Sequence, residues 1–283
     1  YYPSPFSKAA ILTIDGVGEW STATICMAEG KDIRILKTIN FPDSVGLLYS
    51  AFTYYTGFKV NEGEYKLMGL APYGEPIYVD LIKDNIVEIF EDGSIKLNQS
   101  FFGYQDDLKM INGKFEKLFG GPARNAEEPI TQRIRDIARS IQVVVEDIVL
   151  KMAKHAREIT GSKYLCLAGG VALNCVSNGK LLRSKLFDDI WIQPASGDSG
   201  GALGAALALY YQKYDNKIAT DIAKTCQKTS LLGPSFSDSE IQAHLDSFNY
   251  KYQKLEKGLR NQTIAKYLSE GKIVGHFSGR MEY

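Results

Sequence analysis

The sequence predicts an α/β fold in which a mixed sheet is flanked by helices. Near the start, apolar and alternating stretches separated by short turns indicate antiparallel strands. Residues 130–214 then follow the order helix, strand, helix, strand, helix. Strands that alternate with helices are joined by crossover connections, so we expect the later strands to be parallel.

The chain opens with two or three antiparallel strands. Residues 9–16 form an apolar run that enters a tight turn, and residues 19–30 return as an alternating strand. A third strand is predicted at 31–41, after a hairpin turn that contains Gly30.

The next segment mixes short helices with loops. Residues 44–57 predict a short amphipathic helix with Ser44 as its N-cap. Residues 61–76 are expected to be part helix and part loop, either a plain surface loop or a lid in which Lys66 binds an anion. The stretch 77–128 resembles an insertion, with Asp92-Gly93 as a hairpin turn.

A long helix and the α/β alternation follow. Apolar residues recur on one face of 130–160, and Gly161 is expected to end that helix. The elements predicted after it are a strand, a helix, a strand and a helix at 163–170, 171–185, 188–194 and 199–214.

The last part predicts helices at 236–248 and 257–270 and a strand at 272–277, with Ser237 and Glu240 as a capping box. We expect three segments, at 1–128, 129–235 and 236–283. Because a strand lies close to each end, we also expect the chain to be part of a longer protein.

The composition excludes several classes of protein. Lys and Arg number 33, as do Asp and Glu, so the charge does not indicate a nucleic-acid partner. No apolar run is long enough to span a membrane, and no secretory signal opens the chain. With four cysteines and no CxxC pair, we expect a cytoplasmic protein.

The cysteines and histidines do not form a recognisable catalytic or metal-binding pattern. Cys26 and Cys166 lie in strand-like runs and are expected to be buried, whereas Cys175 lies near a glycine turn without an evident histidine partner. The histidines are isolated from one another, at positions 155, 244 and 276. A metal site built from this chain alone would be short of nitrogen ligands.

Three glycine-rich turns, at 15–19, 169–172 and 196–201, are the strongest functional signal. Glycine lets the backbone approach a ligand closely, and the amide groups at a helix N-terminus favour phosphate. Two of these turns follow strands that should be parallel, and ligands bind at the carboxyl ends of such strands. The turns match neither a P-loop nor a complete GxGxxG motif.

Carboxylates occupy two of the turns. Asp15 and Asp198 each lie at a strand end. Such a carboxylate either braces its own turn or acts as a metal ligand or catalytic group. The local context favours a carboxylate that braces its own turn. The setting in nucleotide-type turns favours a metal ligand or a catalytic group.

These stretches together resemble a known family. The matching motifs are LTIDGVGEWSTATI, GEYKLMGLAPYG, LAGGVALNCVSNGKL, IQPASGDSGGALGAAL, LLGPSFSDSEI and HFSGRMEY. They resemble the O-carbamoyltransferases of the nodulation-protein and antibiotic-biosynthesis type, across about the whole chain. The resemblance implies an actin/hexokinase/Hsp70-like (ribonuclease-H-like) fold, similar to the tRNA threonylcarbamoyl-transfer proteins.

The resemblance also implies a reaction. Carbamoyl phosphate and ATP give a carbamoyl-adenylate on a separate YrdC-like domain, and the actin-like domain passes the carbamoyl group to a hydroxyl of a sugar or antibiotic-like acceptor. It further implies a bound divalent metal, usually iron, held by Asp198 and by histidines of a motif that precedes this sequence. Asp15 and Glu19 are the candidate catalytic residues. The candidate nucleotide-binding residues are Gly16, Gly18, Gly169, Gly170, Val171, Asn174, Gly197 and Gly200.

Two alternatives stay open at this point. A sugar kinase of the same fold would place the γ-phosphate of ATP over the 15–19 turn, and a non-catalytic nucleotide-binding module would bind without turnover. In each case we expect small-molecule ligands, no nucleic acid and no membrane, and we allow for a homodimer.

Overall fold

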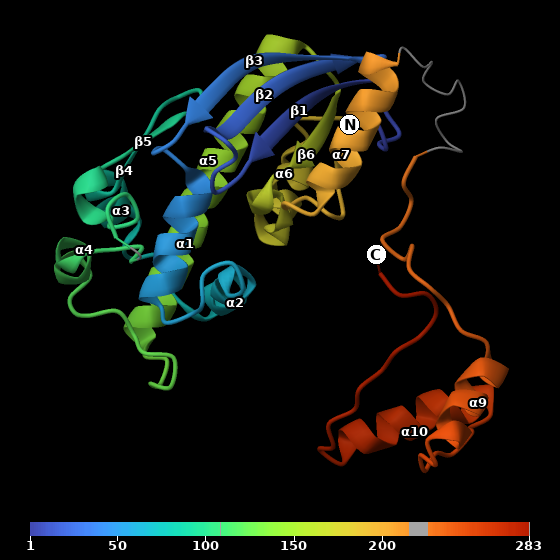
Figure 1. Cartoon of the computed structure of the whole chain (residues 1–283). Coiled ribbons are helices and arrows are strands. Elements are labelled where there is room, and N and C mark those ends of the chain that lie inside the picture. Colours follow the sequence, from blue (N-terminus) through green and yellow to red (C-terminus); the bar gives the residue numbers. More distant parts are fainter. Residues whose placement is uncertain (108, 215–225, 283) are drawn as a thin grey trace. The chain divides into compact units, whose positions relative to one another are not determined.

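The computed structural model describes residues 1–107, 109–214 and 226–282 (Figure 1). The chain divides into two compact units, Tyr1–Gln227 and Lys228–Tyr283. The expected boundaries at 128 and 235 stay a prediction. No helix among the described residues is long and apolar enough to cross a membrane.

The first unit contains a five-stranded mixed sheet in the order β3-β2-β1-β6-β7. β1 (Lys8–Ile14) pairs antiparallel with β2 (Ser21–Glu29), which pairs antiparallel with β3 (Asp32–Asn40). β1 also pairs in parallel with β6 (Tyr164–Ala168), which pairs in parallel with β7 (Asp189–Ile192). The antiparallel opening and the parallel later strands are both confirmed.

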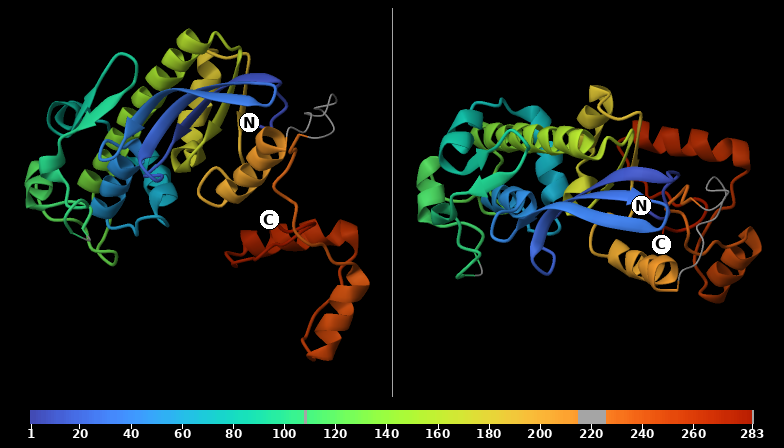
Figure 2. Two further views of the ribbon diagram at one scale, coloured as in Figure 1. Left: turned by 45° about the horizontal axis from the view of Figure 1, so that its top comes forward. Right: turned by 90° about the horizontal axis from the view of Figure 1, so that it is seen from above.

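A long helix, α5 (Gln132–Thr160), covers one face of this sheet (Figure 1). The apolar residues on one face of this helix, including Ile137, Ile141 and Ile148, are wholly buried. Gly161 ends the helix in the left-handed conformation, with φ of 61°, as predicted. α6 (Cys175–Ser184) packs beside it, and α7 (Gly200–Ala208) lies on the opposite side of the sheet (Figure 2).

The segment between β3 and α5 adds a helical layer. It contains α1 (Val45–Tyr55), α2 (Glu64–Leu70), α3 (Val79–Asn85), the hairpin β4 (Val87–Ile89) and β5 (Ile95–Leu97), and α4 (Gly113–Leu118). The predicted N-cap of α1 is confirmed, since Ser44 Oγ accepts from the Leu47 amide at 3.0 Å.

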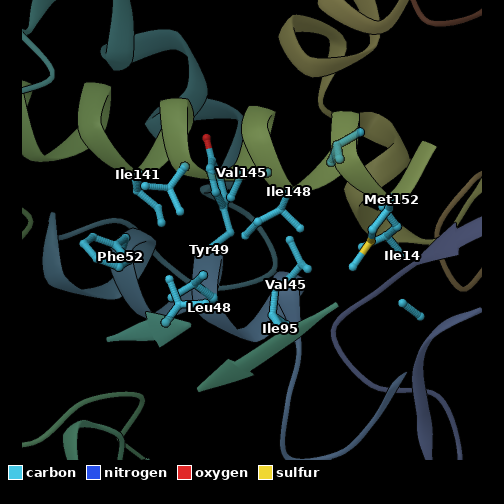
Figure 3. Close-up of a cluster of buried hydrophobic side chains, with 14 of the residues drawn as sticks. Ile14, Val45, Leu48, Tyr49, Phe52, Ile95, Ile141, Val145, Ile148 and Met152 are labelled. Atoms are coloured by element: carbon cyan, nitrogen blue, oxygen red, sulfur yellow. The ribbon is translucent and has the colours of Figure 1, made fainter. Parts of the chain in front are cut away.

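The core lies between α1 and α5, as Figure 3 shows for Tyr49, Phe52, Ile141 and Val145. Fully burying a large apolar side chain contributes about 1.5–3 kcal/mol. The many such side chains on these two helices therefore hold α1 and α5 against each other. The same packing fixes the position of the helix ends that approach the sheet.

The second unit contains α9 (Asp238–Ser247), with the predicted capping box, and α10 (Lys257–Ser269). The predicted strand at 272–277 is wrong, because these residues form no strand in the structure. A strand needs a neighbour to complete its backbone hydrogen bonds, and no other strand lies among the described residues of this unit.

Candidate functional site

The three parallel strands end at one edge of the sheet. Asp15 follows β1, Gly169 and Gly170 follow β6, and the turn that contains Ser196 follows β7. The carboxyl ends of parallel strands are where α/β sheets bind ligands. We call these three turns together the strand-tip site.

Hydrogen bonds join the three turns. Asp15 Oδ1 accepts from the amides of Gly16 at 2.8 Å and of Gly170 at 3.1 Å. The Gly169 amide donates to the carbonyl of Ser196 at 2.8 Å. The turns are therefore one hydrogen-bonded cluster, not three separate loops.

Gly169 is the position where the ends of β1 and β6 approach each other closely. It has φ of 89° and ψ of 159°, a backbone conformation that residues other than glycine rarely adopt. A Cβ at this position would lie 2.2 Å from the carbonyl oxygen of Ile14, at the end of β1. The glycine is thus required by the close approach of the β1 and β6 strand ends.

The N-terminus of α1 supports the first turn from the other side. Ser44 Oγ and the Gly46 amide both donate to the Asp15 carbonyl, at 3.0 and 3.2 Å. A Cβ on Gly46 would lie 2.5 Å from the Gly16 nitrogen. Sequence reasoning identified Ser44 as a helix cap, but it did not identify this second role of Ser44 or the role of Gly46.

The second turn continues as a short 3-10 helix, Gly170–Leu173, where an α-helix from 171 was predicted. α6 begins only at Cys175, with Asn174 as its N-cap. Asn174 Oδ1 accepts from the Ser177 amide at 3.0 Å, and the residue is buried. Its side chain is therefore used inside the protein, and nucleotide contact by Asn174 stays a prediction.

The third turn leads into α7, whose N-terminus has no side-chain cap. Asp198 is exposed, and no atom lies within 4 Å of the Cβ position of Gly197. Ser196 is 4% exposed, and its hydroxyl has no hydrogen-bond partner among the described residues. An uncapped helix N-terminus with open space beside it is suited to an anion.

The structure brings some of the predicted residues together and leaves others apart. Asp15, Gly16, Gly169 and Gly170 form the centre of the cluster, and Gly200 begins α7. Gly18 and Glu19 lie on the exposed connection between β1 and β2, and Val171 packs against the core. Their functional roles stay predictions.

The two turn amides expected to bind phosphate are already occupied. The Gly16 and Gly170 amides both donate to the same carboxylate oxygen, Asp15 Oδ1. This oxygen therefore braces the turns, as one of the two interpretations of Asp15 expected. Asp15 Oδ2 has no hydrogen bond among the described residues. The carboxylate can therefore brace two turns with one oxygen and face a ligand with the other.

No group of three or more His, Cys, Asp or Glu residues among the described part of the chain could hold a metal ion. Asp198 is a single exposed carboxylate, and His155 lies on α5. Structural and catalytic metal sites use three or four protein ligands. The described residues therefore do not form a metal centre by themselves.

A cavity of about 80 Å³ lies elsewhere, between the sheet, the β4–β5 turn and α5. Lys37, Asp92 and His155 are among the residues that line it, and none of the strand-tip residues does. It is therefore separate from the site described above.

The cysteines differ in exposure, which allows a direct check of this arrangement. Cys26 and Cys166 are buried, and burial raises the pKa of both thiols, whereas Cys175 is exposed beside Met68, with their sulfur atoms 3.8 Å apart. Because the thiolate is the reactive form, a raised pKa keeps the two buried thiols protonated at neutral pH.

We therefore expect iodoacetamide to modify Cys175 long before Cys26 or Cys166 in the native protein, as measured by peptide mass mapping. The same reagent in denaturant should modify all of these thiols and serves as the control. Early modification of Cys166 in the native protein would contradict the packing at β6.

The chain that carries the strand-tip site matches a known protein family. Residues 1–207 match the family model described as "Carbamoyltransferase N-terminus", so the chain belongs to the carbamoyltransferase family. The five-stranded mixed sheet flanked by helices is the actin-like fold that the sequence motifs implied.

The similar proteins include nodulation proteins. The chain is 51% identical to an uncharacterized protein of Synechocystis sp., over 100% of this chain and 46% of that protein. It is 34% identical to Nodulation protein NolNO of Sinorhizobium fredii and 33% identical to Nodulation protein NolO of Bradyrhizobium diazoefficiens, in each case over 99% of this chain. The match covers 39% and 48% of those two proteins, so the chain spans less than half the length of these relatives.

Proposed function

We propose that this protein transfers a carbamoyl group from carbamoyl-adenylate, made from carbamoyl phosphate and ATP, to a hydroxyl of a sugar or antibiotic-like acceptor. The observation that carries the proposal is the hydrogen-bonded cluster of glycine turns at the strand tips of a chain that belongs to the carbamoyltransferase family. The acceptor oxygen forms a bond to the carbamoyl carbon, the bond from that carbon to the adenylate oxygen breaks, and AMP leaves.

The geometry suggests how the adenylate is held. We propose that its phosphate lies at the positive end of the α7 dipole, beside the open space at Gly197, because the N-terminus of α7 has no side-chain cap. The Gly200 and Gly201 amides already donate to the carbonyls of Gly197 and Asp198, at 3.1 and 3.0 Å. The unpartnered Ser196 hydroxyl lies in the same turn. A buried polar group without a partner is costly, and a ligand or water bound in this turn would remove that cost.

The acceptor hydroxyl must lose a proton as it attacks. Asp15 Oδ2 and Glu19 are the carboxylates of the first turn that we propose for this step. Asp15 is half-buried and held in place by its other oxygen, whereas Glu19 is exposed. A carboxylate held in one position is the better placed general base, because proton transfer requires hydrogen-bond reach to the acceptor.

The assay that tests this proposal uses the full-length protein with ATP, carbamoyl phosphate and a panel of sugars. Mass spectrometry of the acceptor should show the gain of one carbamoyl group, with AMP formed. Phosphate on the acceptor together with ADP would show a sugar kinase instead, and nucleotide binding without any change in the acceptors would show a non-catalytic module.

For a divalent metal, we propose that Asp198 contributes one ligand and that other ligands come from outside the described residues. Asp198→Ala in the full-length protein should then lower the amount of bound metal and abolish most of the transfer activity. Iron is the metal to look for first. Metal analysis by mass spectrometry measures the first effect. Unchanged metal content in the variant would remove Asp198 from the site.

A further inference from the structure

Gln142 lies in the middle of α5, wholly buried, and every polar atom of its side chain is used. Its Oε1 accepts from the Tyr49 hydroxyl at 2.9 Å and from Asn174 Nδ2 at 3.1 Å. Its Nε2 donates to Asn174 Oδ1 at 3.1 Å and to Glu146 Oε1 at 3.2 Å. These bonds connect three helices through one amide.

The bonds to Asn174 reach the second glycine turn. Asn174 Oδ1 must accept from the Ser177 amide to cap α6, and the amide pair with Gln142 fixes the side chain in that orientation. The Asn174 backbone amide also closes the 3-10 helix by donating to the Val171 carbonyl at 2.9 Å. Gln142 thereby anchors the segment that begins at Gly169 and Gly170.

The bond from Tyr49 reaches the first glycine turn. Burial raises the pKa of the Tyr49 phenol, so the hydroxyl stays protonated and donates to Gln142. Tyr49 lies on α1, whose N-cap Ser44 donates to the Asp15 carbonyl at 3.0 Å. The helices that flank the two turns are therefore tied to the same side chain.

The carboxylate at the remaining end of the network is paired with two cations. Glu146 is 5% exposed, and its carboxylate accepts a hydrogen bond from Lys180 Nζ at 3.2 Å. The same carboxylate lies 3.8 Å from an Arg139 nitrogen. A buried polar network of this kind gives little net stability compared with apolar packing, but when every member is satisfied it fixes one arrangement of the elements.

We propose that Gln142 is a positioning residue, which sets the distance and orientation between the 15–19 and 169–172 turns and so controls nucleotide affinity and transfer. This inference rests on the proposed function. Gln142 lies beneath the site, does not touch the ligand, and acts through Asn174 and Tyr49.

The test compares Gln142→Met with Ser140→Ala in the full-length protein. Methionine has a similar length and forms none of the four bonds. Ser140 is a matched control, because it is wholly buried on the same helix, yet its hydroxyl accepts from the Tyr78 amide at 3.0 Å, at the start of α3, away from the turns. Both variants are assayed well below their unfolding temperatures.

We expect Gln142→Met to lower kcat/KM for carbamoyl transfer about 10²-fold, the size of effect that a displacement of about 1 Å at a reacting centre produces. ATP affinity of the strand-tip site, measured as the ATP concentration that protects residues 167–181 from labelling by an azido-ATP, should weaken at least about tenfold, while Ser140→Ala keeps both values near those of the wild type. Equal losses in the two variants, in proportion to their stability, would overturn the proposal and leave Gln142 as a core residue.

The two readouts separate this inference from the proposed function. If the wild type binds ATP but transfers no carbamoyl group, the proposed reaction fails, and the difference in ATP affinity between Gln142→Met and Ser140→Ala still decides the positioning role. If the wild type binds no ATP, both proposals are overturned.

Discussion

Replacement of Gly169 by alanine should remove both the stability of the strand-tip site and its affinity for nucleotide. The new Cβ would lie 2.2 Å from the Ile14 carbonyl oxygen, and the residue has φ of 89°. The backbone strain costs about 1–3 kcal/mol, and the overlap with a backbone atom that cannot rotate away adds about 1–3 kcal/mol.

The chain can reduce this strain only by moving the β6 strand end away from β1. That movement breaks the bonds from the Gly170 amide to Asp15 and from the Gly169 amide to Ser196. The expected result is therefore a lower free energy of unfolding together with a loss of ATP affinity greater than about tenfold, measured by denaturant titration and by calorimetry at a temperature where the variant is folded.

Gly113→Ala is the matched control for this substitution. Gly113 begins α4, and no atom lies within 4 Å of its Cβ position. The same chemical change there should leave stability and ATP affinity close to wild type. If Gly169→Ala behaves like Gly113→Ala, the close approach of the two strand ends is wrong.

Substitution of Asp15 is expected to separate two roles of one carboxylate. In Asp15→Asn, the side-chain oxygen still accepts from the Gly16 and Gly170 amides, so the fold and ATP affinity should be retained. In Asp15→Ala, both part-buried amides lose their acceptor, and the loss of each such bond costs about 0.5–1.5 kcal/mol. Thermal unfolding and ATP titration of the two variants measure this difference.

Transfer activity is expected to respond differently. If Asp15 Oδ2 removes the proton of the acceptor, both variants should lose about 10²–10⁴ in kcat, the usual contribution of a general base. Asp15→Asn with wild-type kcat would limit Asp15 to the brace and leave Glu19 as the candidate base. Asp15→Ala with unchanged stability would show that the brace itself is wrong.

Local patterns in the sequence predicted those parts of the fold that depend on near neighbours. The apolar spacing of α5, the glycine that ends it, and the caps at Ser44 and Ser237 are all confirmed. The antiparallel strands at the start were likewise expected from their alternation and their short turns. Each of these features is decided within one helix or one hairpin.

The features that were missed depend on contacts between distant parts of the chain. Asn174 is recognisable as the start of a helix, but its pairing with Gln142, 32 residues away, has no local signal. The carbonyl of Ser196, which accepts from the Gly169 amide, is likewise remote in sequence from that residue. The strand expected at 272–277 has an apolar pattern, yet a pattern alone cannot supply the neighbouring strand that a sheet needs.

The central claim is that the turns after β1, β6 and β7 together bind a nucleotide. Its most direct test is photolabelling of the full-length protein with an azido-ATP, followed by peptide mapping, with excess ATP as competitor. We expect ATP-protected labels on peptides that contain residues 12–25, 167–181 or 192–203. Protected labels confined to other parts of the chain, such as the cavity beside Lys37 and His155, would contradict the claim.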